Sequence, residues 1–181
     1  EQIARWEEVC GEMLGRLVAD WEEIRSLLGP ETPPGRLEEA KIDGDPHRGG
    51  RSVLLLLFAS GLRLVYKPKP LAVDAAFQEL LRWTTRRGFE PGFRNLRLLD
   101  RGPYGWMEFV ESAPCRSEEE VRRFYRRQGG YLALLHAIGG IDFHHENLIA
   151  AGEHPVLLDL ETLFQPLLPL PTPSGLVWDP L

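Results

Sequence analysis

The sequence predicts an α+β fold in which a mostly antiparallel sheet comes first and helices follow. Three observations support this prediction: a helical repeat of apolar residues at the start, two pairs of β-rich runs after it, and a second long helix before a loop between two short strands. The chain has 181 residues, of which 43% are hydrophobic and 27% charged, so it can bury a core of its own. No internal repeat is present in the sequence.

The first predicted element is a long amphipathic helix over residues 1–28. Its apolar side chains recur every three or four positions and therefore share one face. They are Trp6, Val9, Met13, Leu17, Trp21, Ile24 and Leu28. The glycine and prolines of residues 29–34 end the helix. We therefore expect a helical lead-in and linker at residues 1–34, the core at residues 35–165 and a proline-rich tail at residues 166–181.

Two β-hairpins and one helix are predicted in the middle of the chain. Each hairpin consists of two β-rich runs that flank a short turn with glycine. Pro68 and Pro70 follow the first hairpin and end its second strand, because proline cannot donate a hydrogen bond to a strand ladder. The helix, residues 74–86, lies between the hairpins. The four strand runs are residues 53–58, 62–66, 95–99 and 106–110.

A second long helix and a last pair of short strands complete the predicted order. Ser117 precedes three glutamates, which is a strong helix start: the hydroxyl accepts an amide bond and the acids face the positive helix end. We expect this helix to run to about His136, where Gly139-Gly140 breaks it. The short strands are expected at residues 148–150 and 156–160.

Composition and charge exclude several classes of function. The net charge of −6 argues against a general nucleic-acid binder, and the longest apolar run, residues 53–60, is too short to span a membrane. No export leader precedes the first helix, and Cys10 and Cys115 lack the spacing of a zinc site or disulfide framework, so a cytoplasmic location is expected. Both ends look cut, and we expect a fragment of a longer protein.

Arginine clusters in two predicted helices, within residues 82–87 and 122–127. The favoured interpretation is that these side chains form solvated helix faces. The alternative is that they line a groove for a peptide or a nucleotide phosphate.

The strongest chemical signal is the segment from Asp142 to Glu161. It opens with Asp142-Phe-His144-His-Glu-Asn147 and closes with Leu-Leu-Asp159-Leu-Glu161. In phosphoryl transfer, one Asp orients or deprotonates the attacking hydroxyl, while an Asn and a second Asp bind Mg²⁺ through oxygen atoms. The step of five from Asp142 to Asn147, followed by Asp159 after a hairpin, matches that arrangement. The sequence therefore predicts a phosphoryl-transfer loop.

Two departures distinguish this loop from that of an ordinary protein kinase. Gly140-Ile141 stands where the kinase motif has His-Arg, and Asp159-Leu160-Glu161 replaces Asp-Phe-Gly. Zinc bound by His136, His144 and His145 is the weaker alternative, because no ligand spacing repeats and no cysteine lies nearby.

A second signal is Lys67, at the end of a predicted strand and upstream of a helix with two acids. This order resembles the lysine–glutamate pair that binds ATP phosphates in kinases. A lysine at a strand end is more often solvated, so the order of the motifs carries the interpretation. The sequence leaves open whether Asp74 or Glu79 pairs with Lys67, with a weak preference for Glu79.

Two further segments are weaker candidates for nucleotide contacts. The glycine-rich residues 44–52 could let backbone amides approach phosphate, yet they lack a nucleotide fingerprint, and Asp45 and His47 could equally be turn residues. The backbone from Glu108 to Val110 would lie where kinases join their lobes and would contact adenine. An interior strand is an equally good interpretation of that run.

Together these motifs resemble the dehydratase domain of class II lanthipeptide synthetases. The matching segments cover most of residues 41–165 and occur in the same order, and the last of them is highly specific. They are GDPHRGGRSV at 44–53, VYKPKPL at 65–71, YGWMEFV at 104–110, FYRRQGGYLALLH at 124–136 and DFHHENLIAAGEHPVLLDLETLF at 142–164.

The resemblance implies a lipid-kinase-like fold of two lobes, with an antiparallel-sheet N-lobe and the start of a helical C-lobe, and with ATP and Mg²⁺ between them. It implies that Ser/Thr of a ribosomal precursor peptide is phosphorylated and the phosphate eliminated, giving dehydroalanine or dehydrobutyrine. It also implies that the whole polypeptide continues into a C-terminal zinc cyclase domain. The isolated fragment is expected to be inactive.

Residue roles follow from the same resemblance. Lys67 would contact the ATP phosphates directly. The acid that pairs with Lys67 would contribute to this contact indirectly. The catalytic loop would consist of Asp142, His144 and Asn147, and the metal would be bound by Asn147, Asp159 and Glu161. Asp45 and His47 match the motif that the family uses for elimination.

Two other functions remain open from the sequence. One is a kinase-like phosphotransferase that lacks the elimination step. The other is a non-catalytic module that binds a nucleotide or a leader peptide, against which the retained Lys67, Asp142, Asn147 and Asp159 argue.

Overall fold

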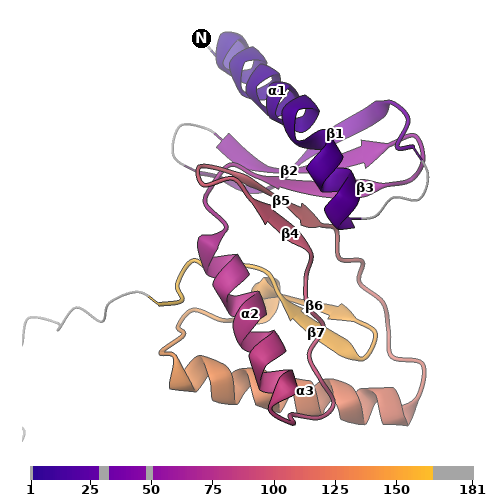
Figure 1. The fold of residues 1–181 in the computed structure, drawn as a ribbon, viewed down its shortest axis with the longest axis vertical. Helices are drawn as coiled ribbons and strands as arrows, with labels where there is room; N and C mark the ends of the chain where they lie inside the picture. The colour runs from indigo at the N-terminus through magenta and orange to yellow at the C-terminus, as the bar shows by residue number, and fades with distance from the viewer. Residues whose placement is uncertain (1, 29–32, 48–50, 165–181) are drawn as a thin grey trace, which may run out of the picture.

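The structure, a computed structural model, describes residues 2–28, 33–47 and 51–164, and the side chains within them except at residues 2–6, 43–47 and 51. A long N-terminal helix lies on one side of an antiparallel sheet, and two helices and a small hairpin lie on the other side (Figure 1). The expected tail at residues 166–181 lies outside the described residues.

The main sheet has five strands in the order β1-β2-β3-β5-β4, and each neighbouring pair is antiparallel. Both predicted hairpins are present, the first as β2 and β3 and the second as β4 and β5. The strands are β1 (Leu37–His47), β2 (Arg51–Phe58), β3 (Arg63–Lys67), β4 (Leu98–Asp100) and β5 (Gly105–Glu108).

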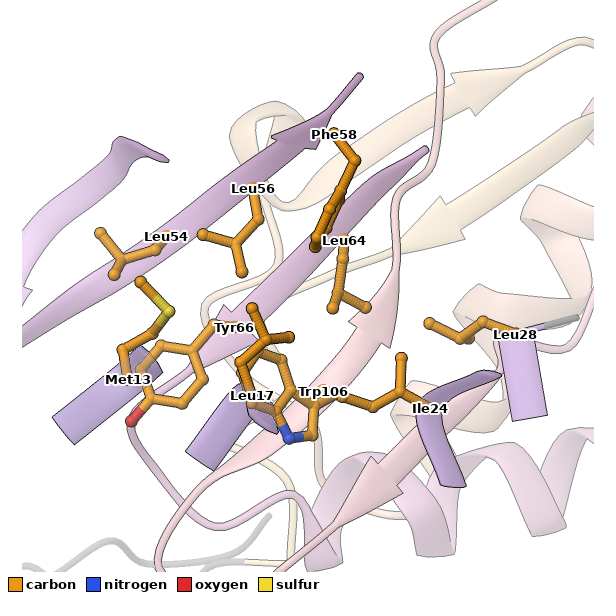
Figure 2. Close-up of a cluster of buried hydrophobic side chains, with 10 residues drawn as sticks. All are labelled: Met13, Leu17, Ile24, Leu28, Leu54, Leu56, Phe58, Leu64, Tyr66 and Trp106. Carbon is orange, nitrogen blue, oxygen red and sulfur yellow. The ribbon is translucent and has the colours of Figure 1, made fainter. Parts of the chain in front are cut away.

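The first helix, α1 (Gln2–Leu28), covers one face of this sheet. Alternate residues of the strands point to opposite faces, so one set from β2, β3 and β5 meets the apolar stripe of α1. Figure 2 shows this cluster, which consists of Met13, Leu17, Ile24 and Leu28 from the helix and Leu54, Leu56, Phe58, Leu64, Tyr66 and Trp106 from the sheet. The segment that the sequence suggested as a lead-in is thus part of the core.

A buried carboxylate fastens α1 to the β4–β5 hairpin. Asp20 accepts hydrogen bonds from Trp106 Nε1 at 2.8 Å, Tyr104 Oη at 2.9 Å and Arg101 Nε at 2.8 Å. Burial raises the pKa of Asp20, but these three bonds and the charge of Arg101 outweigh it and leave the pKa below its usual value. No local pattern in the sequence predicted this contact.

The second half of the chain builds a helical layer. The helices α2 (Ala72–Arg86) and α3 (Glu118–Ala137) pack against each other and against the segment that follows β7. The strands β6 (Leu148–Ala151) and β7 (His154–Leu157) form a separate two-stranded sheet. The predicted cap is confirmed, since Ser117 Oγ accepts from the amide of Glu120 at 3.2 Å.

A small apolar cluster joins this layer to the other face of the main sheet. Met107 of β5 and Val156 of β7 are buried in it together with Leu96 and Val110. The two sheets are therefore held together by side chains that point away from α1.

The strand β1 was not predicted. Residues 44–50 were expected as a loop, but β1 runs to His47 and pairs with β2, with a register irregularity between Asp43 and His47. Side chains 38–42 of this edge strand are all exposed, and most of its residues are Glu, Ala, Lys, Asp, Gly or Pro, which are depleted in strands. A proline at position 46 is compatible with an edge.

Within the described residues, no helix combines the length and the apolar character that a membrane span requires.

Candidate functional site

Lys67 lies buried at the end of β3, on the sheet face that is turned away from α1. Leu64 and Tyr66 point toward α1, so strand alternation directs Val65 and Lys67 to the opposite side. The ammonium of Lys67 donates to Asp74 Oδ1 at 3.2 Å and to the carbonyl of Leu158 at 3.1 Å. A strand lysine is thus joined to the first turn of α2 and to the segment after β7.

The acid that pairs with Lys67 is Asp74, and the preference for Glu79 was wrong. Asp74 is buried in the first turn of α2, next to the end of β3, whereas Glu79 is exposed more than a turn further along the helix. The sequence showed both acids, but only the point at which α2 begins decides which of them reaches the strand end.

Lys69 makes a second link between the same two segments. Its ammonium lies 3.3 Å from Asp159 Oδ1 and 2.9 Å from Glu161 Oε2. Burial lowers the pKa of Lys69, but the bond to Glu161 and the charges of both carboxylates outweigh it, so the pKa is raised. No role was predicted for Lys69, although the run Lys67-Pro68-Lys69 places a second ammonium near the strand end.

The loop from Ile141 to Asn147 is anchored to this acidic segment by main-chain atoms. Leu158 N donates to Asn147 O at 3.0 Å, and Thr162 Oγ1 donates to Ile141 O at 2.7 Å. The structure therefore brings the two motifs that were predicted to work together, around residues 142–147 and 159–161, next to each other.

Asp142 adopts a backbone conformation that few side chains tolerate. Its φ is +62°, in the left-handed region where Asp is one of the more tolerant residues. Asn147 Nδ2 donates to the carbonyl of Asp142 at 3.2 Å, which leaves Asn147 Oδ1 as the side-chain atom able to bind a cation. Backbone strain of this kind clusters at functional sites.

Packing behind the loop fixes where it starts. A Cβ at Gly140 would lie 3.0 Å from Leu163 Cδ2 and 3.1 Å from both Leu135 Cδ2 and Phe143 Cε2. Gly140 thus allows the chain to leave α3 and enter the loop in close contact with three apolar side chains.

The remaining loop candidates are exposed. His144 Nδ1 accepts a long bond, 3.3 Å, from the amide of Glu146, and it opens a short 3-10 turn, η2 (His145–Asn147). In the described part of the chain, the carboxylate of Asp142 forms no ion pair with Lys67 or Lys69, so the loop and the lysines are joined through the main chain rather than through these side chains.

The donor set suits Mg²⁺ better than zinc. Among the residues whose placement is described, no three His, Cys, Asp or Glu side chains gather as metal ligands, which removes His136, His144 and His145 as a zinc site. Magnesium on a phosphate needs only one or two protein oxygen ligands, since phosphate and water complete its shell. Asn147 and Asp159 provide such oxygens on adjoining segments. The ammonium of Lys69, which lies next to Asp159, shows that this carboxylate can hold a cation.

The adenine contact predicted for Glu108 needs correction. The amide of Glu108 donates to the carbonyl of Arg97 at 2.9 Å, and the residue pairs with Leu64 of β3, so this part of β5 is an interior strand. The side chain of Val110 is buried in the cluster that joins the two sheets. The chain leaves the sheet after Glu108, where β5 ends, and the backbone that follows lies outside the hydrogen-bonded ladder of the main sheet.

Two predicted site residues, Asp45 and His47, fall in the edge strand β1. Asp45 and His47 belong to β1 by their backbone, but their side chains lie outside the described residues, as do residues 48–50 of the glycine-rich segment.

The arginine run of α3 divides into two kinds of side chain. Arg122 is exposed and pairs with acids of the same helix, as a solvated face requires. Arg127 is buried and donates to the carbonyls of Gly92 and Glu153, both at 2.8 Å. For Arg127, the solvated interpretation was therefore wrong: this side chain ties α3 to the turn between β6 and β7.

Comparisons with known proteins place the chain among relatives. A family model described as a domain of unknown function, DUF4135, matches residues 1–176. The lacticin 481/lactococcin biosynthesis protein LcnDR2 of Lactococcus lactis subsp. lactis is 35% identical over 163 residues, which cover 84% of this chain and 18% of that protein. The chain thus spans less than a fifth of the length of this relative.

Proposed function

This chain belongs to the DUF4135 family and, as its motifs indicated, is related to the class II lanthipeptide synthetases, and from this premise we propose that it is part of their dehydratase domain. The whole protein would use ATP and Mg²⁺ to phosphorylate Ser/Thr of a ribosomal precursor peptide, and would then eliminate the phosphate. The rest of the polypeptide would include the zinc cyclase domain.

The observation that carries the proposal is the contact between the end of β3 and the acidic segment after β7. Lys67 donates to the carbonyl of Leu158, and Lys69 pairs with Asp159 and Glu161. Two ammonium groups, two carboxylates and the Asp142–Asn147 loop are thereby assembled from segments about 90 residues apart in the chain. Phosphoryl transfer relies on this mixture of cations and hard oxygen ligands.

A two-lobed, kinase-like arrangement is part of the proposal. The five-stranded sheet with α2 would be the N-lobe, and α3 with the β6–β7 hairpin would begin the C-lobe. The buried pair of Lys67 with an acid of the helix that follows its strand supports this comparison, because kinases use such a pair to hold the ATP phosphates.

In the first half-reaction, Asp142 would orient the attacking hydroxyl and accept its proton as the oxygen bonds to the γ-phosphorus of ATP, while the bond from that phosphorus to the β-phosphate oxygen breaks and ADP leaves. Lys67 would neutralise charge on the phosphates, and Asn147 with Asp159 would hold the metal ion, with Glu161 beside them. Magnesium, when bound, supplies charge neutralisation on the phosphate oxygens. His144, exposed in the same loop, would contact the peptide or the phosphate.

In the second half-reaction, a base removes the α-proton of the phosphorylated residue. The electron pair of that C–H bond forms the double bond as the C–O bond breaks and phosphate leaves. Phosphate leaves far more readily than hydroxide, so a base and donors to the departing oxygens are sufficient. We assign Asp45 and His47 to this half-reaction.

The test uses the full-length protein, ATP, Mg²⁺ and a Ser/Thr-containing precursor peptide, with the product read by mass spectrometry. Loss of one water per modified residue is the expected result. A stable phosphopeptide would instead indicate a phosphotransferase without elimination, and an unchanged peptide with bound nucleotide would indicate a binding module.

Two variants refine the test. Asp142→Asn should abolish phosphorylation, whereas Glu146→Gln, an exposed carboxylate of the same loop, should retain it. Normal turnover by Asp142→Asn would remove Asp142 from the catalytic role.

A further inference from the structure

Lys69 lies between two prolines, directly after β3, and its ammonium bridges two carboxylates of the segment after β7. The distances are 3.3 Å to Asp159 Oδ1 and 2.9 Å to Glu161 Oε2. Pro68 and Pro70 limit the backbone here, because a proline ring locks its own φ and restricts the residue before it. The ammonium thus reaches the same carboxylates that the proposed function assigns to Mg²⁺.

The two carboxylates are presented together because the residue between them is buried. Leu160 has an exposed fraction of 2% and packs in the apolar cluster formed with α2 and α3. Asp159 and Glu161, on either side of it, are about half exposed. The core therefore anchors this segment at Leu160, and its two carboxylates remain accessible to a cation.

Lys69 differs from Lys67 in how easily it can leave its partners. The side chain of Lys67 is 9% exposed and that of its partner Asp74 7%, so breaking that pair would leave a buried charge unpaired. The carboxylates that pair with Lys69 are about half exposed, and water screens such a pair. A lysine ammonium on its flexible four-carbon stem can then turn to another acceptor nearby. Lys67 is therefore a fixed charge, whereas Lys69 is an exchangeable one.

The ammonium of Lys69 and a magnesium ion would compete for the same oxygen atoms. Mg²⁺ binds oxygen at about 2.0–2.1 Å, so an ion on Asp159 Oδ1, which is 3.3 Å from the ammonium, would lie no more than roughly 5.5 Å from it. Two positive charges at this separation repel each other. Phosphate oxygens remove the conflict, because they accept hydrogen bonds from an ammonium and also bind the metal.

We propose that Lys69 couples metal binding to nucleotide binding. Without nucleotide, its ammonium stays on Asp159 and Glu161 and weakens their affinity for Mg²⁺. When ATP binds, the ammonium turns to a phosphate oxygen and leaves the carboxylates to the ion. This inference rests on the proposed function, which makes Asp159 a magnesium ligand. Each ligand then strengthens the binding of the other, since coupling between two sites is reciprocal.

The experiment measures two affinities of the full-length protein separately. Mn²⁺, which takes the same oxygen ligands as Mg²⁺, is titrated without nucleotide, and the free ion is measured by electron paramagnetic resonance. ATP is titrated in EDTA by isothermal titration calorimetry. Lys69→Met should bind Mn²⁺ at least about tenfold more tightly than the wild type, because the competing charge is gone. It should bind ATP at least about tenfold more weakly, because two unpaired carboxylates then lie beside the phosphates.

Three further variants control the two titrations. Lys69→Arg keeps the charge and should bind Mn²⁺ no more tightly than the wild type. Lys41→Met removes an exposed lysine that pairs with Glu39 at 3.2 Å on β1, and should change neither affinity. Lys69→Met/Asp159→Asn should lose the gain in Mn²⁺ affinity, because the gain depends on an ion bound at Asp159.

An unchanged Mn²⁺ affinity in Lys69→Met, or a change of both affinities in the same direction, would overturn the proposal. A purely structural role of Lys69 would weaken both. Lys69→Gln repeats the two titrations with a polar side chain, in case Lys69→Met does not fold. Neither titration needs a precursor peptide or turnover, so the coupling can be demonstrated even if the protein does not dehydrate a peptide. Conversely, dehydration with an unchanged Mn²⁺ affinity in Lys69→Met would remove the coupling and leave the proposed function intact.

Discussion

The ammonium of Lys69 lies 2.9 Å from Oε2 of Glu161, and 92 residues separate the two in the chain. This ion pair, shared with Asp159, places a cation beside the carboxylates that the sequence assigned to a metal. It also closes the end of β3 onto the segment after β7. The pair is therefore both a fold contact and a feature of the candidate site.

Lys69→Met should reduce the free energy of unfolding by no more than about 1 kcal/mol near neutral pH, because both carboxylates are about half exposed and water screens the pair. The pKa of Lys69 is raised in the folded protein, so its contribution is fully present below the usual lysine pKa of 10.5 and is lost as the pH rises through the folded value. Urea unfolding at a series of pH values measures this: the difference between wild type and Lys69→Met should persist through neutral pH and vanish in strong alkali. A difference that disappears already near neutral pH would contradict the ion pair.

Lys67→Met should destabilise the protein far more, by about 3–5 kcal/mol, because it leaves the carboxylate of Asp74 buried without its cation. Replacing both residues, as Lys67→Met/Asp74→Leu, should recover much of this loss, since the uncompensated charge is removed. The double-mutant cycle is measured by urea unfolding. Glu79→Gln, on the exposed side of the same helix, is the matched control and should change stability by less than about 0.5 kcal/mol. Additive effects of the two single changes would argue against the buried pair.

Asp142→Gly should separate stability from activity. Glycine occupies a φ of +62° without strain, so the variant should be as stable as the wild type or slightly more stable, by up to about 1 kcal/mol. It lacks the carboxylate, so phosphorylation of the precursor peptide should be lost. Thermal unfolding and mass spectrometry of the same preparation provide the two readings. A variant that is active would show that the backbone, not the carboxylate, matters at this position.

Asp20→Asn should lower the free energy of unfolding by about 1–3 kcal/mol at neutral pH, because it weakens three hydrogen bonds that hold α1 on the sheet. The pKa of Asp20 lies below the usual aspartate value of 3.8, so its contribution is present above that value and is lost as the pH falls through the lower, folded pKa. Wild type and Asp20→Asn should therefore converge in stability only in strong acid. The exposed Glu22→Gln in the same helix should have little effect at any pH.

Local sequence patterns were sufficient to predict the elements whose own residues indicate their structure clearly. The leucine-rich β2, the serine cap of α3 and the helical repeat of α1 were all predicted, because each depends on residues close together in the chain. The edge strand β1 was missed, since it consists mostly of residue types that are depleted in strands and its side chains 38–42 are all exposed. Its backbone hydrogen bonds with β2 hold β1 as a strand, although its own residues do not indicate one.

The candidate site was predicted in its motifs but not in its pairings. Asp142, Asn147 and Asp159 were named from their spacing, and Lys67 from the order of the motifs. The partner of Lys67 depended on where α2 begins, and the role of Lys69 depended on a contact between segments about 90 residues apart. Neither of these distances follows from local pattern.

The peptide unit at Leu158 has a consequence for how this protein can diverge. Its carbonyl accepts from Lys67 and its amide donates to the carbonyl of Asn147, so both of its ties to the site use atoms that every amino acid except proline possesses. Relatives are therefore free to exchange the side chain at this position for others that fill the same apolar space. In a sequence alignment such a column would look unremarkable, although the junction between the two halves of the site runs through it.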